Sequence, residues 1–187
     1  MRYFNYYLIG INIVGLILFI INSHIKVKLI DILLSLISLF FGSFGIIIGM
    51  IMTKDKIQKD NMLSRVFVLC SFVIETIILF ILKDFYQKEI TLNVYTFLYY
   101  HQLFSIYLIT INIITFIVFG IDKIKAISHQ YRIKITTLLS LSFIGGSLGA
   151  LIGMYTFKHK TKVNYFTIGV PLMLLMHIII IFFIMNI

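Results

Sequence analysis

Long apolar runs decide what this chain can fold into. A helix needs roughly 20 apolar residues to cross a bilayer. Six segments reach about that length: Phe4–Ile21, Leu29–Met52, Leu63–Leu82, Thr96–Gly120, Ile135–Phe157 and Phe166–Ile187. The connections are short, and only 12% of the residues are charged, about half the fraction usual in soluble domains. The sequence therefore predicts an all-α integral membrane protein with six transmembrane helices and no soluble domain.

The two halves of the chain repeat each other. Phe4–Ile17 and Phe104–Ile117 are identical at eight of fourteen positions. A second match pairs Gly42, Ser43, Gly45, Gly49, Met50, Lys54 and Lys56 with Gly146, Ser147, Gly149, Gly153, Met154, Lys158 and Lys160. We therefore predict two domains, residues 1–93 and 94–187, each of three helices. Three crossings per half would turn the second half over, giving the inverted repeats found in many secondary transporters.

The net charge of +9 is expected in loops beside anionic lipid headgroups, where Lys and Arg set the orientation of the helices. No part of the sequence offers a surface for stacking bases or entering a groove, so we expect no nucleic acid partner. If loops alternate between the two sides, the side of the N-terminus collects nine Lys and Arg and the other side seven. This small bias predicts a cytoplasmic N-terminus.

The one cysteine, Cys70, lies in an apolar segment, so we predict no disulfide, metal site or cofactor.

The second half carries several motifs in a defined order. They are GIDKIKA at Gly120–Ala126, Arg132 with Ile133, GGSLGALIGM at Gly145–Met154, KHKTK at Lys158–Lys162, and then Phe166, Gly169 and Pro171. In order and spacing they resemble the bacterial domain of unknown function (DUF) 1294 family, whose members are short three-helix membrane proteins, some fused to a cold-shock domain. The resemblance implies a multi-pass protein of the bacterial cell (plasma) membrane and implies no activity.

The first half resembles the same family less closely. Asn22 stands in place of Asp122, Asp55 in place of His159, Ile57 in place of Thr161 and Phe67 in place of Pro171. The chain is therefore similar to a fused tandem of one degenerate and one well-matched copy. Any chemistry that needs the full motif is expected in the second half.

Polar residues inside the apolar segments are candidates for a substrate site, because such residues are costly in a bilayer. They are Asn12, Asn112, Glu75 and His177. Glu75 and His177 fall two residues apart in the aligned halves, so we expect them to line one polar interior. The alternative is structural: a neutral His bonded to a backbone carbonyl, a protonated Glu bonded to a neighbour, and Asn side chains that join helices.

The basic segment Lys158, His159, Lys160, Thr161 and Lys162 is a candidate site for an anion or a lipid headgroup. Topology and headgroup contact could explain the lysines alone, but they require neither the hydroxyl nor the imidazole. Arg132 is a further candidate. A straight helix would place Arg132 at the opposite end from the basic segment, so the two could share a site only if the chain re-enters.

Small residues mark the second apolar segment of each half. These glycines are Gly42, Gly45, Gly49, Gly145, Gly146, Gly149 and Gly153. Small side chains let helix backbones approach closely, so we predict helix packing there. The alternative is a thinned wall where a substrate or lipid passes.

Together these features predict a membrane protein that transports or flips a small or amphiphilic substrate at a midplane site between the halves. Anionic substrates and lipid phosphates are included in this class. The first alternative is a non-catalytic subunit that packs against a larger membrane complex, and the second is an enzyme acting on a lipid phosphate with His159 as acid or base. No catalytic residues are predicted. The expected partners are membrane lipids, a small-molecule or lipid substrate, and a membrane protein partner or a second copy.

Overall fold

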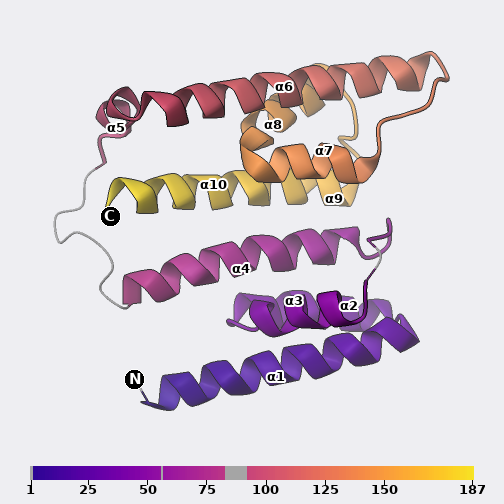
Figure 1. Cartoon of the computed structure of the whole chain (residues 1–187). Helices are drawn as coiled ribbons and strands as arrows, with labels where there is room; N and C mark the ends of the chain where they lie inside the picture. Colours follow the sequence, from indigo (N-terminus) through magenta and orange to yellow (C-terminus); the bar gives the residue numbers. More distant parts are fainter. Residues whose placement is uncertain (1, 56, 83–91) are drawn as a thin grey trace. The chain divides into compact units, whose positions relative to one another are not determined.

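The computed structural model describes residues 2–55, 57–82 and 92–187, and all regular structure in these ranges is helical. The chain divides into two compact units, unit 1 at Met1–Asp84 and unit 2 at Phe85–Ile187. Figure 1 labels the helices and colours them by their order along the chain. The two units are described separately below.

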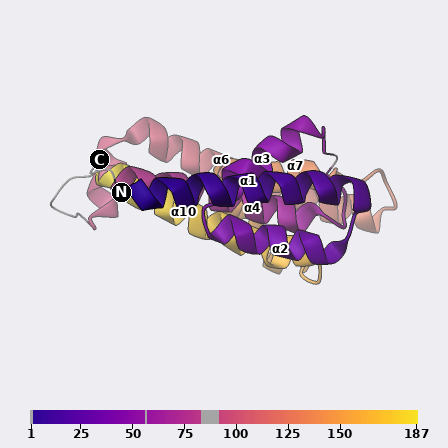
Figure 2. The same ribbon diagram turned by 90° about the horizontal axis from the view of Figure 1, so that it is seen from below.

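Unit 1 consists of two long helices with a helical hairpin between them. Its helices are α1 (Arg2–Ile25), α2 (Lys28–Leu39), α3 (Ser43–Met52) and α4 (Met62–Leu82). In Figure 2 the two arms of the hairpin, α2 and α3, diverge on either side of α1. The chain turns at Phe41, whose φ of +67° interrupts the helix. Phe19, Leu34, Ile46 and Val68 form the apolar core of this unit, one from each helix.

Unit 2 follows the same plan with short additional helices. It contains α5 (Val94–Tyr100), α6 (Gln102–Ile127), α7 (Ile135–Leu141), the π-helical turn η1 (Ser142–Gly146), α8 (Ser147–Thr156), α9 (Asn164–Thr167) and α10 (Gly169–Met185). The break between α7 and α8 lies at Gly145, where φ is +131°, a conformation open to glycine and strained for other residues. Figure 1 shows the chain reversing direction there.

Ion pairs and hydrogen bonds show that the first and last residues of each hairpin lie close together. Arg65 bonds both Asp31, near the start of α2, and Asp55, just after α3. Asp122 bonds both Ile133, before α7, and His159, after α8. A continuous α-helix would hold the two members of each pair roughly 35–40 Å apart at 1.5 Å per residue, so neither segment is straight.

The prediction of one continuous helix over Leu29–Met52 is therefore wrong. Within the described residues, five helical stretches are long and apolar enough to cross a membrane: Tyr3–Ile25, Met62–Leu82, Gln102–Ile127, Ile135–Thr156 and Asn164–Met185. Of these, Ile135–Thr156 contains the reversal at Gly145. The six crossings and the inverted repeat predicted from the sequence stay predictions.

Glycines let each hairpin lie against the preceding helix. A Cβ atom added to Gly45 would collide with the backbone of Asn12, and one added to Gly149 with the backbone of Asn112. The other predicted packing glycines face close neighbours within their own units: Gly42 faces Ile37, Gly49 faces Phe19, Gly145 faces Ile111, Gly146 faces Thr115 and Gly153 faces Phe119. None of these seven glycines is exposed.

Candidate functional site

The turn of the first hairpin is bonded by Asn12 of α1. Its Nδ2 donates to the carbonyl of Phe41 at 2.8 Å, and its Oδ1 accepts from the amide of Gly45 at 2.7 Å. The same Nδ2 donates to the carbonyl of Leu8 at 2.8 Å. One amide side chain thus satisfies a donor and an acceptor that the break leaves without helical partners.

Asn112 of α6 makes the corresponding bonds in unit 2. Its Nδ2 donates to the carbonyl of Gly145 at 3.0 Å, and its Oδ1 accepts from the amide of Gly149 at 2.7 Å. It also donates to the carbonyl of Leu108 at 2.7 Å. The asparagine shared by the two halves therefore has the same backbone partners in each unit.

The tyrosines one turn earlier also bond the hairpin turns. The hydroxyl of Tyr7 donates to the carbonyl of Phe40 at 2.9 Å. The hydroxyl of Tyr107 donates to the carbonyl of Ile144. Each turn thus receives two side-chain contacts from the helix that precedes it.

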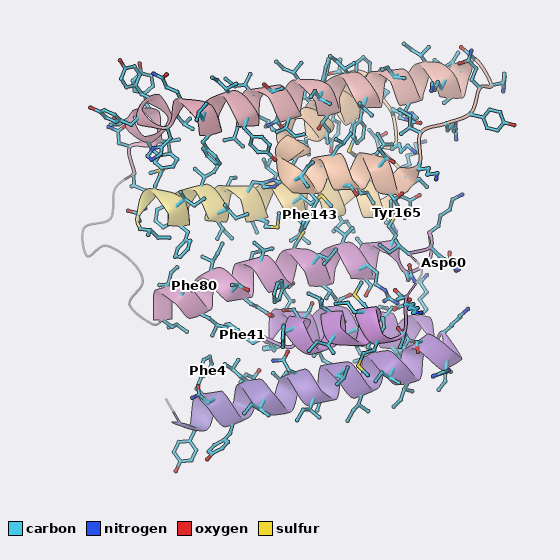
Figure 3. All side chains as sticks on the ribbon, viewed as in Figure 1. Phe4, Phe41, Asp60, Phe80, Phe143 and Tyr165 are labelled. Carbon is cyan, nitrogen blue, oxygen red and sulfur yellow. The ribbon has the colours of Figure 1, made fainter. Side chains whose placement is uncertain are left out.

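Glu75 of α4 bonds the first turn from the other side. Its Oε1 accepts from the amide of Phe41 at 2.9 Å, and its Oε2 accepts from the hydroxyl of Ser43. In Figure 3, Phe41 lies at the turn, at the opposite end of the hairpin from Asp60. The carboxyl group is therefore engaged with the start of α3, where the helix dipole also favours negative charge.

His177 of α10 occupies the comparable place in unit 2. Its Nε2 lies 2.8 Å from the carbonyl of Phe143, and its Nδ1 lies 2.8 Å from the hydroxyl of Ser147. Because a carbonyl only accepts, Nε2 carries a proton, and a neutral ring then accepts from the serine through Nδ1. Ser43 and Ser147, aligned in the sequence, each bond the last long helix of their own unit.

The four residues predicted to bind substrate thus all contact hairpin turns. Asn12 and Glu75 do so in unit 1, and Asn112 and His177 in unit 2. The structure brings Asn12 and Glu75 to one turn and Asn112 and His177 to the other. These bonds correspond to the structural alternative for these side chains, and a shared polar interior for Glu75 and His177 stays a prediction.

The open end of the second hairpin is organised around Asp122, whose side chain is fully buried. Its Oδ1 accepts from the amide of Ile133 at 3.0 Å. Its Oδ2 lies 2.8 Å from Nε2 of His159 and 3.3 Å from Nζ of Lys160. This end of the hairpin is called the base of unit 2 below.

The reversal also brings Arg132 and the basic segment to this one base, whereas a straight helix would have separated them. Arg132, Lys158 and Lys162 are exposed there, and Thr161 is half-buried. His159 and Lys160 are turned inward to Asp122. The candidate anion-binding residues therefore fall into an exposed group and an inward group.

The base of unit 1 has a different ion cluster, which the sequence analysis missed. Arg65, 4% exposed, donates to Asp31 at 2.8 Å and to Asp55 at 2.7 Å. Asn22 donates to Asp31 at 3.0 Å and accepts from the amide of Val27 at 2.9 Å. An arginine just inside an apolar segment was the signal, because such a charge needs an acidic partner.

The aromatic neighbours of the two bases also correspond. The guanidinium of Arg65 lies 4.7 Å from the ring centre of Phe19. Nζ of Lys160 lies 5.1 Å from the ring centre of Phe166. Both contacts are within the range of cation–π attraction. Among the described residues, no three His, Cys, Asp or Glu side chains gather in a group that could hold a metal ion.

Comparison with known proteins identifies the family. The model of the family described as "Protein of unknown function (DUF1294)" matches residues 112–166, from Asn112 through the base of unit 2. The uncharacterized protein YsdA of Bacillus subtilis (strain 168) is 44% identical over 80 residues, which cover 43% of this chain and 90% of YsdA. The chain belongs to the DUF1294 family. No solved structure matches it.

The DUF1294 match covers the turn and the base of the second hairpin together. It begins at Asn112, which bonds the turn, and ends at Phe166, which lies under Lys160. Between them lie Asp122 and His159, joined at the base. The matched part of this DUF1294 chain is thus a complete hairpin together with Asn112, which bonds its turn, and the Asp122–His159 pair at its base.

Proposed function

We propose that this DUF1294 protein is a multi-pass protein of the bacterial plasma membrane in which α1, α4, α6 and α10 cross the bilayer and both hairpins re-enter from one side. Broken helices inside a bilayer need their backbone groups satisfied by protein. The bonds from Asn12, Glu75, Asn112 and His177 meet that need at the two turns. This arrangement replaces the six crossings expected from the sequence.

The proposed orientation follows from the charge of each unit taken separately. Of the six Lys and Arg at described positions in unit 1, five belong to the hairpin base: Lys26, Lys28, Lys54, Lys59 and Arg65. In unit 2, all seven at described positions do: Lys123, Lys125, Arg132, Lys134, Lys158, Lys160 and Lys162. Because Lys and Arg accumulate in cytoplasmic loops, both bases face the cytoplasm and the N-terminus lies outside. The opposite orientation expected earlier depended on loops that alternate between sides.

The same argument favours a tandem of two copies with one orientation. Each unit crosses the membrane an even number of times, and each has its own strong charge bias. Asn12 and Asn112 make matching bonds in the two units. YsdA, matched over 90% of its length by 80 residues, is about as long as one unit. These observations support a degenerate and a well-matched copy fused in parallel rather than inverted.

The function proposed is the movement of an anionic amphiphile from the cytoplasmic leaflet along the hairpins. The observation that carries it is the convergence of Ile133 and His159 on Asp122, because it brings the Arg132 loop and the basic segment to one base. The exposed cations there, Arg132, Lys134, Lys158 and Lys162, suit a phosphate-bearing headgroup. The hairpin turns carry polar groups to the interior of the span, as the broken helices of transporters do.

The two alternative functions have less support. A subunit that docks through its glycines would need them on its surface, whereas the predicted glycines face their own unit. An enzyme with His159 as acid or base would need a ring nitrogen that reaches a lipid phosphate, whereas His159 is buried and its Nε2 is bonded to Asp122.

Reconstitution tests the proposal. The purified protein is placed in phosphatidylglycerol-containing vesicles with a trace of lipid labelled on its headgroup with a fluorophore that external dithionite bleaches. Without movement between leaflets about half of the signal survives, and with movement it falls well below half. We expect Lys158→Ala with Lys162→Ala to slow the loss at least several-fold, while Lys59→Ala, at an exposed lysine of unit 1, leaves it unchanged. A signal that stays at half with the intact protein would refute transport of phospholipid.

A further inference from the structure

The base of unit 1 contains a cavity that the function above does not use. Its volume is about 840 Å³, and its walls come from the ends of α1 and α3, the starts of α2 and α4, and the segment between α3 and α4. Lys26, Lys28 and Lys54 line it together with Asp31, Asp55, Asp60 and Arg65. The cavity lies wholly within unit 1, so its geometry does not depend on unit 2.

The charges in this cavity are unequally paired. Arg65 bonds both Asp31 and Asp55 and compensates much of their charge. No ion pair joins Lys26, Lys28 or Lys54 to an acidic residue within the described parts of the chain. The remaining carboxylate, Asp60, is exposed at the rim. Counted together, the lining holds four cationic and three acidic side chains, an excess of one positive charge, which favours an anionic ligand.

The backbone holds two of the lysines at fixed places. Lys26 follows α1 with φ +56°, and Lys54 follows α3 with φ +50°. The amide of Lys26 donates to the carbonyl of Asn22 at 2.8 Å, and that of Lys54 donates to the carbonyl of Ile51 at 3.2 Å. These left-handed turns set where each side chain starts, while the ammonium ends remain free to move onto a ligand.

The base of unit 2 is closed in part by a lysine. Lys160 is turned inward, where its ammonium lies 3.3 Å from the buried Asp122. At the aligned position in unit 1 the acid is replaced by Asn22, and His159 is replaced by Asp55, which pairs with Arg65. Unit 1 therefore closes its base with Arg65 rather than with a lysine.

Apolar side chains adjoin the cationic wall. Met52 lines the cavity and is 65% exposed, and Leu29, beside Lys28, is also 65% exposed. Thr53 and Gln58 add hydroxyl and amide groups to the lining. A ligand with a phosphate group, a polar headgroup and an apolar tail would match all three kinds of wall.

We propose that the cavity at the base of unit 1 binds a phosphate ester, with Lys26, Lys28 and Lys54 contacting the phosphate oxygens. The anion is the phosphodiester of an acidic phospholipid or a free phosphate ester of similar size. Flexible lysines suit this role because they approach a phosphate as point charges. The site is separate from the basic segment of unit 2 and does not require that the protein transports anything.

The test measures binding to the full chain in a neutral detergent. The probes are dioctanoyl phosphatidylglycerol, dioctanoyl phosphatidylcholine and glycerol 3-phosphate. Isothermal titration calorimetry measures the affinity of each probe. We expect phosphatidylglycerol to bind at least tenfold more tightly than phosphatidylcholine and to weaken with added salt. Equal affinity for glycerol 3-phosphate would assign the site to a free ester, and much weaker affinity would assign it to a lipid.

Matched variants decide the location. Lys26→Ala, Lys28→Ala and Lys54→Ala together should weaken phosphatidylglycerol binding at least tenfold. Lys123→Ala together with Lys125→Ala removes two positive charges from unit 2 at residues outside both proposed binding groups, and should change it less than threefold. Circular dichroism and gel filtration check that both variants fold. If the triple variant does not fold, the single variant Lys54→Gln replaces it and should weaken binding about threefold or more. Equal losses in both sets, or no preference for the anionic probes, would overturn the proposal.

Discussion

The side chain of Asn112 accepts a hydrogen bond from the backbone amide of Gly149 at 2.7 Å, joining residues of α6 and α8 that are 37 positions apart. The same side chain donates to the carbonyl of Gly145 at the break. Both backbone groups have lost their helical partners, and lipid offers no substitute. Asn112 is therefore what lets the second hairpin turn inside an apolar environment.

Asn112→Leu should destabilise the protein by about 2–6 kcal/mol, because it leaves a buried donor and a buried acceptor unsatisfied at about 1–3 kcal/mol each. The measurement is unfolding by sodium dodecyl sulfate in mixed micelles, followed by circular dichroism. Thr110→Leu changes an exposed residue of the same helix and serves as the control. A variant that unfolds at the same detergent fraction as Thr110→Leu would contradict this role.

Gly45→Ala should destabilise unit 1 because its new methyl group would collide with the backbone of Asn12, which has no flexible end to move. Overpacking of this kind costs about 1–3 kcal/mol. Gly10→Ala is the matched control, since it lies in α1 with no atom near enough to meet a methyl group. Unfolding curves of the two variants should separate clearly, and Gly10→Ala should match or exceed the parent.

Asp122→Ala should cost more than Asp122→Asn. Alanine leaves His159 and Lys160 facing a buried cavity without their acidic partner, a loss of about 3–5 kcal/mol. Asparagine still accepts from the amide of Ile133, as Asn22 accepts from Val27 in unit 1, so we expect about 1–3 kcal/mol. Asp60→Asn, at an exposed position, is the comparison in the same unfolding measurement. Equal stability for all three variants would show that the base does not need this carboxylate.

Arg65→Lys should destabilise the protein although it keeps the charge. The guanidinium reaches Asp31 through Nη1 and Asp55 through Nε, and a lysine ammonium cannot span two carboxylates with the same fixed geometry. We expect a loss of about 1.5–3 kcal/mol, the value of hydrogen bonds to charged groups. The exposed Arg132→Lys should change stability by less than about 0.5 kcal/mol, as surface substitutions do. Comparable losses in the two variants would argue against the two-acid bridge.

The proposed orientation predicts which positions react from outside the cell. In a Cys70→Ala background, Tyr3→Cys, at a position 88% exposed, should react with a membrane-impermeant maleimide on intact cells. Ser128→Cys, exposed between α6 and α7, should react only after the cells are opened. The reverse pattern would place the N-terminus in the cytoplasm and reject the orientation inferred from the charges.

The sequence predicted the helical membrane class and the repeated positions, and the structure assigns those positions a different task. Asn12 and Asn112 align across the halves, and each bonds a hairpin turn. Their partners could not be read from periodicity, because Leu29–Met52 has the length and apolarity of a spanning helix. The bend at Phe41 shows no proline and follows from contacts with residues 29 to 34 positions away.

The sequence by itself indicated a lipid environment for most of the chain, the family, and the polar residues that recur in its motifs. Apolar length and sparse charge require lipid, and the motif from Asn112 to Phe166 identifies DUF1294. The tertiary structure decided the direction of the chain. The backbone groups of an apolar run can be satisfied in two ways. The run can form one long helix, or it can form two short helices whose turn is hydrogen-bonded by side chains of other helices. Side chains distant in the sequence, among them Asn112 at the turn and Asp122 at the base of one hairpin, select the second solution.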